Sequence, residues 1–169
     1  TRNNTGLGSH QYTAFNKVLF SGSDSVVNGR FSFTAPVPMD ISYSDEQGLL
    51  SFFAVDSSFL RSAQGRYENF TVGGTAQDVV NDGIGPDIKL YLNDPSFVDG
   101  DEVNSTPCLW VELYDENGIN TVGTGVGHDI TAMIDNSPHH TYNLNSMFVP
   151  EVGDYKRGKI MLPLNRLEP

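Results

Sequence analysis

One cysteine and four histidines are the side chains of this 169-residue sequence that could carry nucleophilic chemistry. A thiolate beside a histidine is the minimum set for cysteine-peptidase chemistry. Cys108, however, begins the apolar run from Cys108 to Val111, and apolar surroundings suppress formation of the reactive thiolate. We therefore interpret Cys108 as a buried, unreactive structural residue. As the single cysteine, it also excludes an intrachain disulfide and a cysteine-rich zinc site.

Histidine could supply a base or a metal ligand at two places. His139 and His140 follow Pro138 in an expected hairpin, but adjacent residues of a regular strand point to opposite faces and do not chelate one ion. His128 precedes Asp129 in a glycine-rich loop, and a carboxylate can orient a catalytic histidine in this way. No serine or cysteine nearby in the sequence completes such a triad. We expect surface histidines at 139 and 140 and a structural role for His128.

Oxygen-bearing side chains crowd the middle of the chain, and calcium prefers such ligands. They are Asp78, Asn81, Asp82, Asp87, Asp94, Asp99, Asp101 and Glu102. The stretch from Asp78 to Pro86 resembles the calcium-binding linker of cadherin-like repeats, although its spacing to the proline differs. No loop here has the ligand pattern of an EF-hand. We expect these side chains to be solvated turn residues, with a calcium site as the alternative.

Four acidic residues lie on or beside expected strands, where two carboxylates could hydrolyse a glycosidic bond. They are Asp56, Glu112, Asp115 and Glu116. That reaction requires a defined separation between the two carboxyl groups, which a sequence does not fix. Acidic residues are also common at strand ends and on solvent faces, and this is the interpretation we adopt. We predict no catalytic residue, no cofactor-binding residue and no metal ligand in this chain.

Trp110 and Tyr114 alternate with apolar residues along one expected strand, so both should point away from the core. They could form an aromatic strip that binds peptide or sugar. They could equally face a neighbouring domain of a larger protein. The sequence leaves both alternatives open.

Short stretches of alternating apolar and polar residues determine where these side chains should lie. Such period-two patterns, broken by Gly, Pro, Asn, Asp and Ser, are typical of half-buried antiparallel strands. The residues expected to face a core in the second half of the chain are Ile88, Leu90, Leu92, Leu109, Val111 and Leu113. Other strands are expected at residues 17–21, 49–55, 65–72, 129–134, 141–144 and 159–164, with a helical turn only within 57–64. Pro163 indicates an edge strand or a strand end.

The segment from Ser25 to Thr34 predicts a β-hairpin. Asn28 and Gly29 readily adopt the positive φ angles that a two-residue hairpin turn requires. Phe31 and Phe33 would then face the core.

A polar, glycine-rich connection divides the alternating pattern into two halves. Domain boundaries usually fall in such segments. We predict an all-β fold of two antiparallel immunoglobulin-like β-sandwich modules, residues 1–74 and 86–169, joined by a linker at 75–85.

The chain is strongly acidic, with 21 acidic and 10 basic residues and a net charge of −11. This sign repels nucleic-acid phosphates and anionic lipid, so we predict no nucleic-acid partner. The sequence contains neither a membrane-spanning apolar run nor a signal peptide, and we predict no direct membrane insertion. If the protein is exported, its targeting segment is not part of this sequence.

An ordered series of short segments resembles one known family. The segments are Lys17–Gly22, Val27–Phe33, Val37–Ile41, Ile84–Asp94, Ser96–Gly100, Asp115–Asn120 and Gly125–Ile130. In this order they resemble the region that follows the peptidase domain in the surface sortase of the type IX secretion system, a gingipain-like cysteine peptidase of Gram-negative bacteria. The series, rather than any single motif, carries the resemblance, which covers most of the chain from Phe15 onward.

The resemblance implies a larger parent enzyme that removes a C-terminal sorting signal from secreted cargo and attaches the cargo to surface lipopolysaccharide. The family's catalytic Cys and His belong to another domain and match no residue here, which implies non-catalytic structural or interaction modules. An extracytoplasmic, cell-surface location is also implied. The expected partners are the peptidase domain of the parent chain and other secretion or surface proteins. Family modules extend beyond Thr1 and Pro169, so both modules are expected to be incomplete here.

A free-standing extracellular adhesin-like module, stiffened by calcium, is the alternative. A peptidase encoded upstream in the same gene would favour the first interpretation, and tandem copies of the segment would favour the second.

Overall fold

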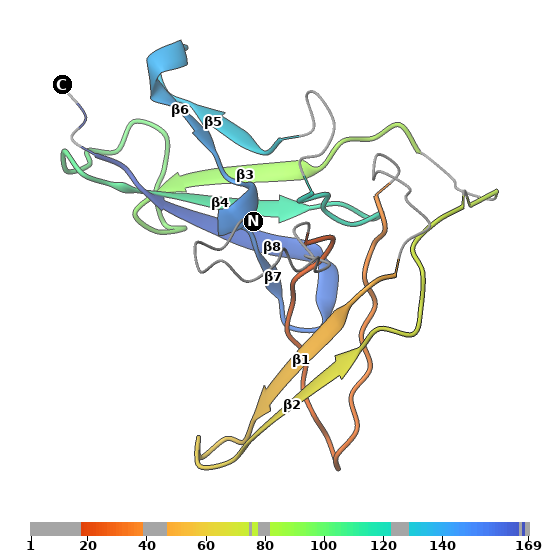
Figure 1. The fold of residues 1–169 in the computed structure, drawn as a ribbon. Coiled ribbons are helices and arrows are strands. Elements are labelled where there is room, and N and C mark those ends of the chain that lie inside the picture. The colour runs from red at the N-terminus through yellow and green to blue at the C-terminus, as the bar shows by residue number, and fades with distance from the viewer. Residues whose placement is uncertain are drawn as a thin grey trace, which may run out of the picture.

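The computed structural model describes residues 18–38, 47–74, 76–77, 82–122, 129–165 and 167. These residues form antiparallel β-strands and two three-residue 3₁₀ helices, which confirms the predicted all-β class (Figure 1). The strands are β1 Leu50–Val55, β2 Ser62–Tyr67, β3 Asp87–Leu92, β4 Cys108–Tyr114, β5 Thr131–Met133, β6 Thr141–Asn143, β7 Val149–Glu151 and β8 Asp154–Pro163, and the 3₁₀ helices are η1 Pro138–His140 and η2 Asn145–Met147. Among the described residues, no helix has the length and apolarity needed to cross a membrane.

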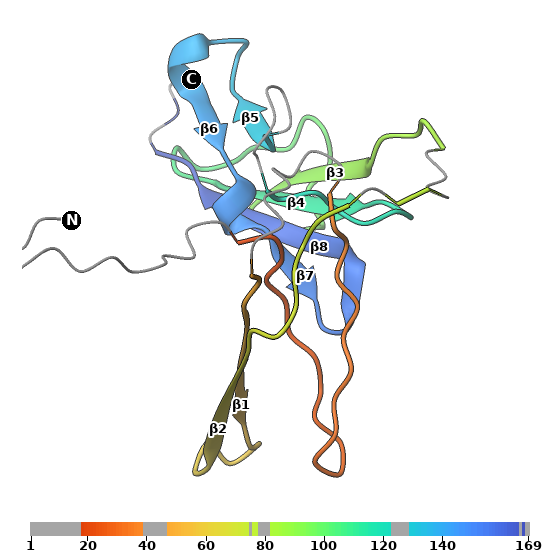
Figure 2. The same cartoon turned by 45° about the vertical axis from the view of Figure 1, so that its right-hand side comes forward.

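The largest sheet has four strands in the order β3-β4-β8-β7, so β4 and β8 lie in its centre and β3 and β7 at its edges. The pairs β1–β2 and β5–β6 form separate two-stranded sheets. In two views, the β1–β2 hairpin extends to one side of the four-stranded sheet and the β5–β6 hairpin to the other (Figures 1 and 2). The expected strand 159–164 is longer than predicted, because β8 begins at Asp154.

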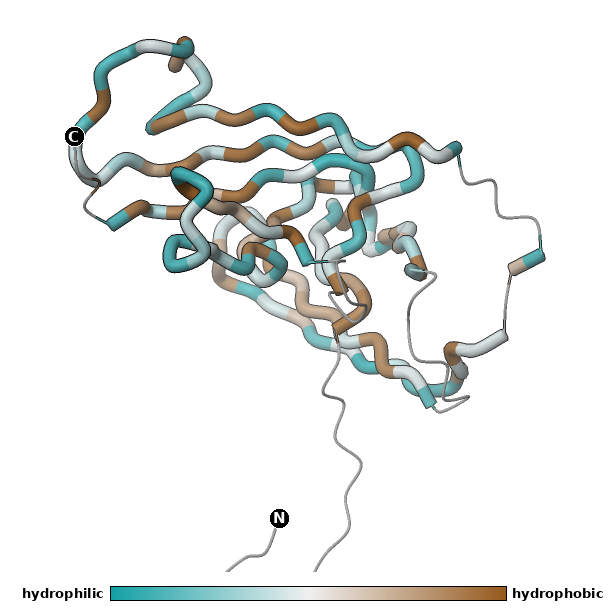
Figure 3. The backbone as a smooth tube through the Cα atoms, turned by 90° about the horizontal axis from the view of Figure 1, so that it is seen from above, coloured by the Kyte–Doolittle hydropathy of each residue, from teal (hydrophilic) through white to brown (hydrophobic). Residues whose placement is uncertain are grey.

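One face of the four-stranded sheet carries the hydrophobic core. Val111 on β4 lies directly opposite Ile160 on β8, and the two residues are 4% and 0% exposed. The remaining buried apolar residues are Leu113, Ile119, Leu144, Leu162 and Leu164, with Ile130, Ala132, Tyr142 and Phe148 packed against them. The alternating apolar positions along the strands, visible in Figure 3, confirm the inward direction predicted for Val111 and Leu113.

Gly158 makes room for an aromatic ring on β8. A Cβ atom at Gly158 would lie 2.3 Å from Cζ of Phe148 and 2.7 Å from the carbonyl oxygen of Val149, both far inside van der Waals contact. Glycine therefore lets the Phe148 ring lie directly on the strand. This close approach joins the segment before β7 to the core.

The predicted two-residue turn at Asn28 and Gly29 is confirmed. Their φ angles are 53° and 73°, and Val27 and Arg30 exchange two backbone hydrogen bonds of 2.9 and 3.0 Å. Residues 18–38 contain no regular strand, however, so the hairpin is limited to this one bridge. The strand predicted at 17–21 is wrong for residues 18–21, and Lys17 lies outside the described residues.

Phe31 and Phe33 contact the β1–β2 hairpin, and they are less buried than predicted. Their ring centroids lie 5.1 and 5.7 Å from that of Phe52 on β1. The two side chains are still 51% and 45% exposed, because only one hairpin covers them. The prediction that they face a closed core is therefore wrong.

The β1–β2 hairpin differs from its predicted bounds. The strand predicted at 65–72 is β2, Ser62–Tyr67, and the predicted helical turn within 57–64 is a hairpin loop followed by the start of β2. The Asp56 carboxylate accepts hydrogen bonds from the amides of Leu60 and Arg61, at 3.0 and 3.4 Å. These contacts close the loop early, so pairing with β1 begins at Ser62 opposite Val55.

Two residues predicted to be buried are exposed because β3 is an edge strand. Ile88 and Leu90 have their side chains on the core face but are 54% and 61% exposed, since no other strand of the described residues pairs with the far edge of β3. Leu92, farther along β3, is partly buried. Pro163 ends the central strand β8 opposite Cys108, which confirms the strand-end alternative.

The strands before and after residues 75–85 belong to different sheets, and the two halves of the chain still touch. The amide of Gly153, in the turn between β7 and β8, donates a 2.9 Å hydrogen bond to the carbonyl oxygen of Ser23. The division into two modules, and the immunoglobulin-like form of each, remain predictions.

Candidate functional site

The face of the four-stranded sheet opposite the core, here called the outer face, carries aromatic and charged side chains. Trp110, Glu112 and Tyr114 of β4 alternate with the core residues of the same strand and therefore point to it. The register places Trp110 between Tyr91 of β3 and Met161 of β8. The outer face comprises Asp87, Lys89, Tyr91, Trp110, Glu112, Tyr114, Arg157, Lys159 and Met161.

Cations lie over both aromatic rings of β4. The guanidinium carbon of Arg157 is 4.4 Å from the centroid of the Tyr114 ring, and the Lys159 ammonium is 5.3 Å from the centroid of the Trp110 ring. Each contact at an exposed site stabilises by about 0.5–1 kcal/mol. The outward direction predicted for Trp110 and Tyr114 is confirmed. Because cations cover the rings, a sugar would have to displace them before stacking there.

The indole N–H of Trp110 is buried and has no hydrogen-bond partner among the described residues. Burying a donor without a partner is costly. Trp110 is therefore held by ring packing and by Lys159 rather than by a hydrogen bond of its own.

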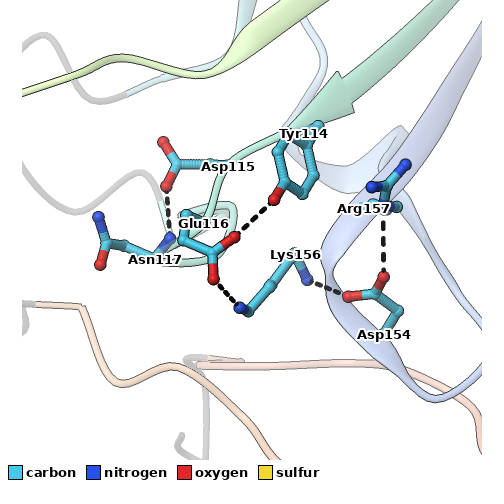
Figure 4. A network of polar contacts seen from close by, with 7 residues as sticks. All are labelled: Tyr114, Asp115, Glu116, Asn117, Asp154, Lys156 and Arg157. Carbon is cyan, nitrogen blue, oxygen red and sulfur yellow. Dashed lines mark hydrogen bonds and ion pairs between the residues drawn. The ribbon is translucent and has the colours of Figure 1, made fainter.

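A polar network lies where β4 ends, beside β8 (Figure 4). The Tyr114 hydroxyl and the Lys156 ammonium each donate a 2.5 Å hydrogen bond to the Glu116 carboxylate. Asp154 accepts a 2.8 Å hydrogen bond from the Lys156 amide and pairs with Arg157 at 3.6 Å. This network fixes the position of Tyr114 under Arg157.

The network shifts the titration of its members. The hydrogen bond from Lys156, followed by that from Tyr114, lowers the pKa of Glu116. The hydrogen bond to Glu116 raises the pKa of Lys156, and the same carboxylate raises the pKa of Tyr114. All three groups therefore keep their ordinary charge states at neutral pH, and Glu116 is unsuited to act as a general acid.

Of the four acidic residues considered for glycoside hydrolysis, Glu112, Asp115 and Glu116 lie on or just after β4, and Asp56 follows β1 of a different sheet. Asp56 lies in the β1–β2 loop, where desolvation acts to raise its pKa but hydrogen bonds from Ser58, Arg61 and Leu60 outweigh this and lower it. Asp115 accepts a 2.7 Å hydrogen bond from the amide of Asn117 in a turn, and Glu112 lies on the outer face.

Three of the carboxylates considered for calcium accept hydrogen bonds within local turns. Asp82 accepts a hydrogen bond from the amide of Ile84, and Asp101 accepts one from the amide of Val98. Both the hydroxyl and the amide of Ser96 bind Asp94, and these bonds lower the pKa of Asp94. Asp87 lies on β3, Asp99 and Glu102 are exposed in the loop after it, and Asp78 and Asn81 lie outside the described residues. The described residues contain no cluster of three metal-ligating side chains.

Cys108 begins β4 and is half-buried, which is less than the burial predicted for it. Its amide donates a 3.1 Å hydrogen bond to the side-chain oxygen of Asn93, and its Sγ lies 3.8 Å from the carbonyl oxygen of Leu109. The residue is thus tied to β3 and to its own strand. Alternation along β4 points its side chain to the same side as Trp110 and away from the core.

His139 and His140 lie in η1, the exposed loop of the β5–β6 hairpin, which confirms the predicted surface position. Asp129 is exposed shortly before β5, and His128 lies outside the described residues. The structure therefore brings together none of the described histidines with Cys108.

A cavity of about 340 Å³ lies between the segment around the Asn28–Gly29 turn, strand β1 and the β7–β8 turn. Phe31, Phe33, Phe52 and Tyr155 line it, with Asp24 and Asp154 among the polar residues. It contains neither a cysteine nor a histidine and is a packing space between two halves of the chain.

Comparison with solved structures relates this chain to a known protein. No protein-family model and no curated protein matches the sequence. Among solved structures, the crystal structure of dimeric latent PorU from Porphyromonas gingivalis matches with 39% sequence identity and a TM-score of 0.51. The match covers 78% of this chain and 12% of the PorU chain. This chain is similar to a segment of PorU.

The PorU match is longer than either predicted module. The larger predicted module, 86–169, is about half of the chain, so a match to PorU over 78% of the chain includes residues on both sides of 75–85. PorU therefore contains counterparts of both halves in one continuous polypeptide.

Sequence reasoning missed the cations of the outer face. Arg157 precedes the expected strand 159–164, and no apolar alternation marks residues 154–158 as part of it. The spacing of Arg157 and Lys159 could have indicated that both lie on the outer face, because residues two apart on a strand share a face.

Proposed function

We propose that this chain is a non-catalytic accessory part of a larger cell-surface sortase of the type IX secretion system. The observation that carries this proposal is the 39% identity to PorU across 78% of the chain. The resemblance of the sequence to this family implies the activity of the parent protein, which is removal of a C-terminal sorting signal and attachment of the cargo to the surface.

In this proposal, the chemistry belongs to a Cys and a His of a separate peptidase domain. Residues 1–74 and 86–169 act as two β-sandwich modules that follow this domain and support it. The chain acts outside the cytoplasm, and its partners are the parent's peptidase domain and other secretion or surface proteins.

We place the contact with the parent's peptidase domain on the outer face. Tryptophan, tyrosine and arginine are enriched at the centres of protein interfaces. Trp110, Tyr114 and Arg157 supply all three types on one side of one sheet. Lys89 and Lys159 add positive charge there, although the chain as a whole has a net charge of −11. With Arg157, these cations outnumber Asp87 and Glu112 on the same face by three to two, so we expect the face to favour an acidic surface on its partner.

The gene that encodes this chain provides the first test. We expect a peptidase with a catalytic Cys and His upstream in the same reading frame. A gene with tandem copies of this segment and no peptidase would contradict the proposal and favour the adhesin alternative.

Binding provides the second test. The purified chain and the peptidase domain of its parent, expressed separately, should form a complex by isothermal titration calorimetry. We expect Trp110→Ala to raise the dissociation constant at least about tenfold. Phe53→Ala is the matched control, because Phe53 is an exposed aromatic residue of the separate β1–β2 sheet. Equal affinities for the two variants would place the contact elsewhere.

A further inference from the structure

The chain contains two Asn-Gly dipeptides, Asn28-Gly29 and Asn117-Gly118. An asparagine followed by glycine can lose its side-chain amide without an enzyme, because glycine has no Cβ atom to shield its backbone nitrogen. That nitrogen attacks the side-chain carbon Cγ of the asparagine, and the rate depends on whether the fold lets the two atoms meet. The reacting atoms of the two dipeptides are the same, so their surroundings decide which one reacts.

Asn28 and Gly29 form the two-residue turn that Val27 and Arg30 close. The two hydrogen bonds of this bridge, 2.9 and 3.0 Å long, use the amides of Val27 and Arg30 and leave the Gly29 amide outside the bridge. A Cβ atom at Gly29 would meet no atom of the described residues within 4 Å. Within residues 18–38 this bridge is the only regular pairing, so the turn opens at little cost. Opening allows the backbone to rotate until the Gly29 nitrogen reaches Cγ of Asn28.

The turn at Asn117 and Gly118 restrains the same atoms. The Gly118 amide donates a 3.0 Å hydrogen bond to the carbonyl oxygen of Asp115, and the Asn117 amide donates a 2.7 Å hydrogen bond to the Asp115 carboxylate. A Cβ atom at Gly118 would lie 2.8 Å from Cδ2 of Tyr155. The next residue, Ile119, is buried in the core. The Gly118 nitrogen is therefore hydrogen-bonded and packed, and its attack on Asn117 would require part of the core to open.

We propose that Asn28 is a site of spontaneous deamidation and that the fold protects Asn117 from the same reaction. The Gly29 nitrogen loses its proton to solvent and forms a bond to Cγ of Asn28. The bond between Cγ and the side-chain nitrogen breaks, and ammonia leaves with a proton that replaces the one lost by Gly29. Water then opens the resulting five-membered imide at either of its two carbonyl carbons. One opening gives aspartate, and the other gives isoaspartate, in which the main chain runs through the former side chain.

Isoaspartate adds one carbon atom to the backbone of the turn. A two-residue hairpin turn requires a defined backbone twist, so the longer turn no longer brings Val27 and Arg30 together. Phe31 and Phe33 follow this bridge, and their ring centroids lie 5.1 and 5.7 Å from that of Phe52 on β1. Loss of the bridge therefore loosens the contact between this segment and the β1–β2 hairpin.

Peptide mapping by mass spectrometry tests the site. The purified chain is incubated in a mildly alkaline buffer, which favours loss of the amide proton, and the deamidated fraction is followed at both dipeptides. We expect Asn28 to react at least about tenfold faster than Asn117 in the folded chain. In urea the two rates should agree within about twofold, because the dipeptides then lose their different surroundings. Equal rates in the folded chain, or an unchanged ratio in urea, would overturn the proposal.

Hydrogen exchange tests the consequence for β1. Anion exchange isolates the deamidated chain, which carries one more negative charge. Its β1 amides should exchange at least about threefold faster than those of Asn28→Asp, which has the added charge without the added backbone carbon. Asn28→Gly is the second control, because glycine also accepts the turn and has no side-chain amide to lose, so the incubation should not change its β1 exchange. Equal β1 exchange in the deamidated chain and in Asn28→Asp would refute the loosening of this contact.

Discussion

Arg157 and Tyr114 lie directly opposite each other on β8 and β4, with the guanidinium carbon 4.4 Å from the centroid of the ring. The ring also donates its hydroxyl hydrogen to Glu116, which in turn binds Lys156. The outer face is therefore organised by contacts between two central strands of one sheet.

Replacement of Ile160 by alanine tests the position of the core. Ile160 is 0% exposed at the centre of the four-stranded sheet, and the variant should lose about 3 kcal/mol of unfolding free energy, measured by urea titration. Met161→Ala is the control, because Met161 is 48% exposed on the opposite face and its replacement should cost about 0.5 kcal/mol. Similar losses of unfolding free energy in both variants would show that the core does not lie on the face that carries Ile160.

The turn at Asn28 and Gly29 should depend on its glycine. Gly29 has a φ of 73°, a conformation that costs an alanine about 1 kcal/mol, so Gly29→Ala should lower the stability by that amount. Asn28→Gly should have little effect, because glycine accepts the φ of 53° at that position. The melting temperatures of the two variants, measured by thermal unfolding, should therefore differ. If Gly29→Ala were as stable as the unchanged chain, the turn would have a different conformation.

Acid should remove the contribution of Glu116 to stability. Its pKa in the folded chain lies below the ordinary value of 4.5, so the contribution is present above that value and is lost as the pH falls through the folded pKa. The raised pKa of Lys156 has the opposite sign, with a contribution that is lost at high pH. The difference in urea midpoint between the unchanged chain and Glu116→Gln should therefore shrink on acidification. A constant difference between about pH 7 and pH 2 would show that the network contributes nothing.

Calcium should not stabilise the chain. Asp82 and Asp94 already accept hydrogen bonds from nearby amides, so their oxygens are engaged in turns. Addition of about 5 mM calcium should raise the melting temperature by less than about 1 °C, as should the same concentration of magnesium. A calcium-specific rise of several degrees that disappears in Asp82→Asn would reveal a metal site.

The sequence predicted those features that depend on local patterns. The alternation through Val111 identified the core face of β4, and Asn28–Gly29 identified a turn, because side-chain period and turn chemistry are local properties. The exposure of Ile88 depends instead on β3 being an edge strand, and strand order is a tertiary property that alternation does not reveal. The bounds of β2 likewise depended on hydrogen bonds from Leu60 and Arg61 to Asp56, which a helical propensity could not indicate.

Within the candidate site, the aromatic residues were predicted and the cations were not. Trp110 and Tyr114 lie in a strongly alternating segment, so their outward direction followed from the pattern. Arg157 reaches Tyr114 only through the register between β4 and β8, which joins residues more than forty positions apart in the sequence. Sequence pattern alone did not set this register.

We propose that this chain supports a sortase whose chemistry resides in another domain, and Cys108 offers a direct test because it is the single cysteine of the chain. The measurement is the rate at which the full-length parent removes the C-terminal sorting signal from its cargo, compared between the unchanged parent and the Cys108→Ser variant at equal abundance. The two rates should lie within about twofold of each other if the nucleophile belongs to another domain. A loss of about a thousandfold or more in a folded, normally abundant variant would contradict it and assign the nucleophile to this chain.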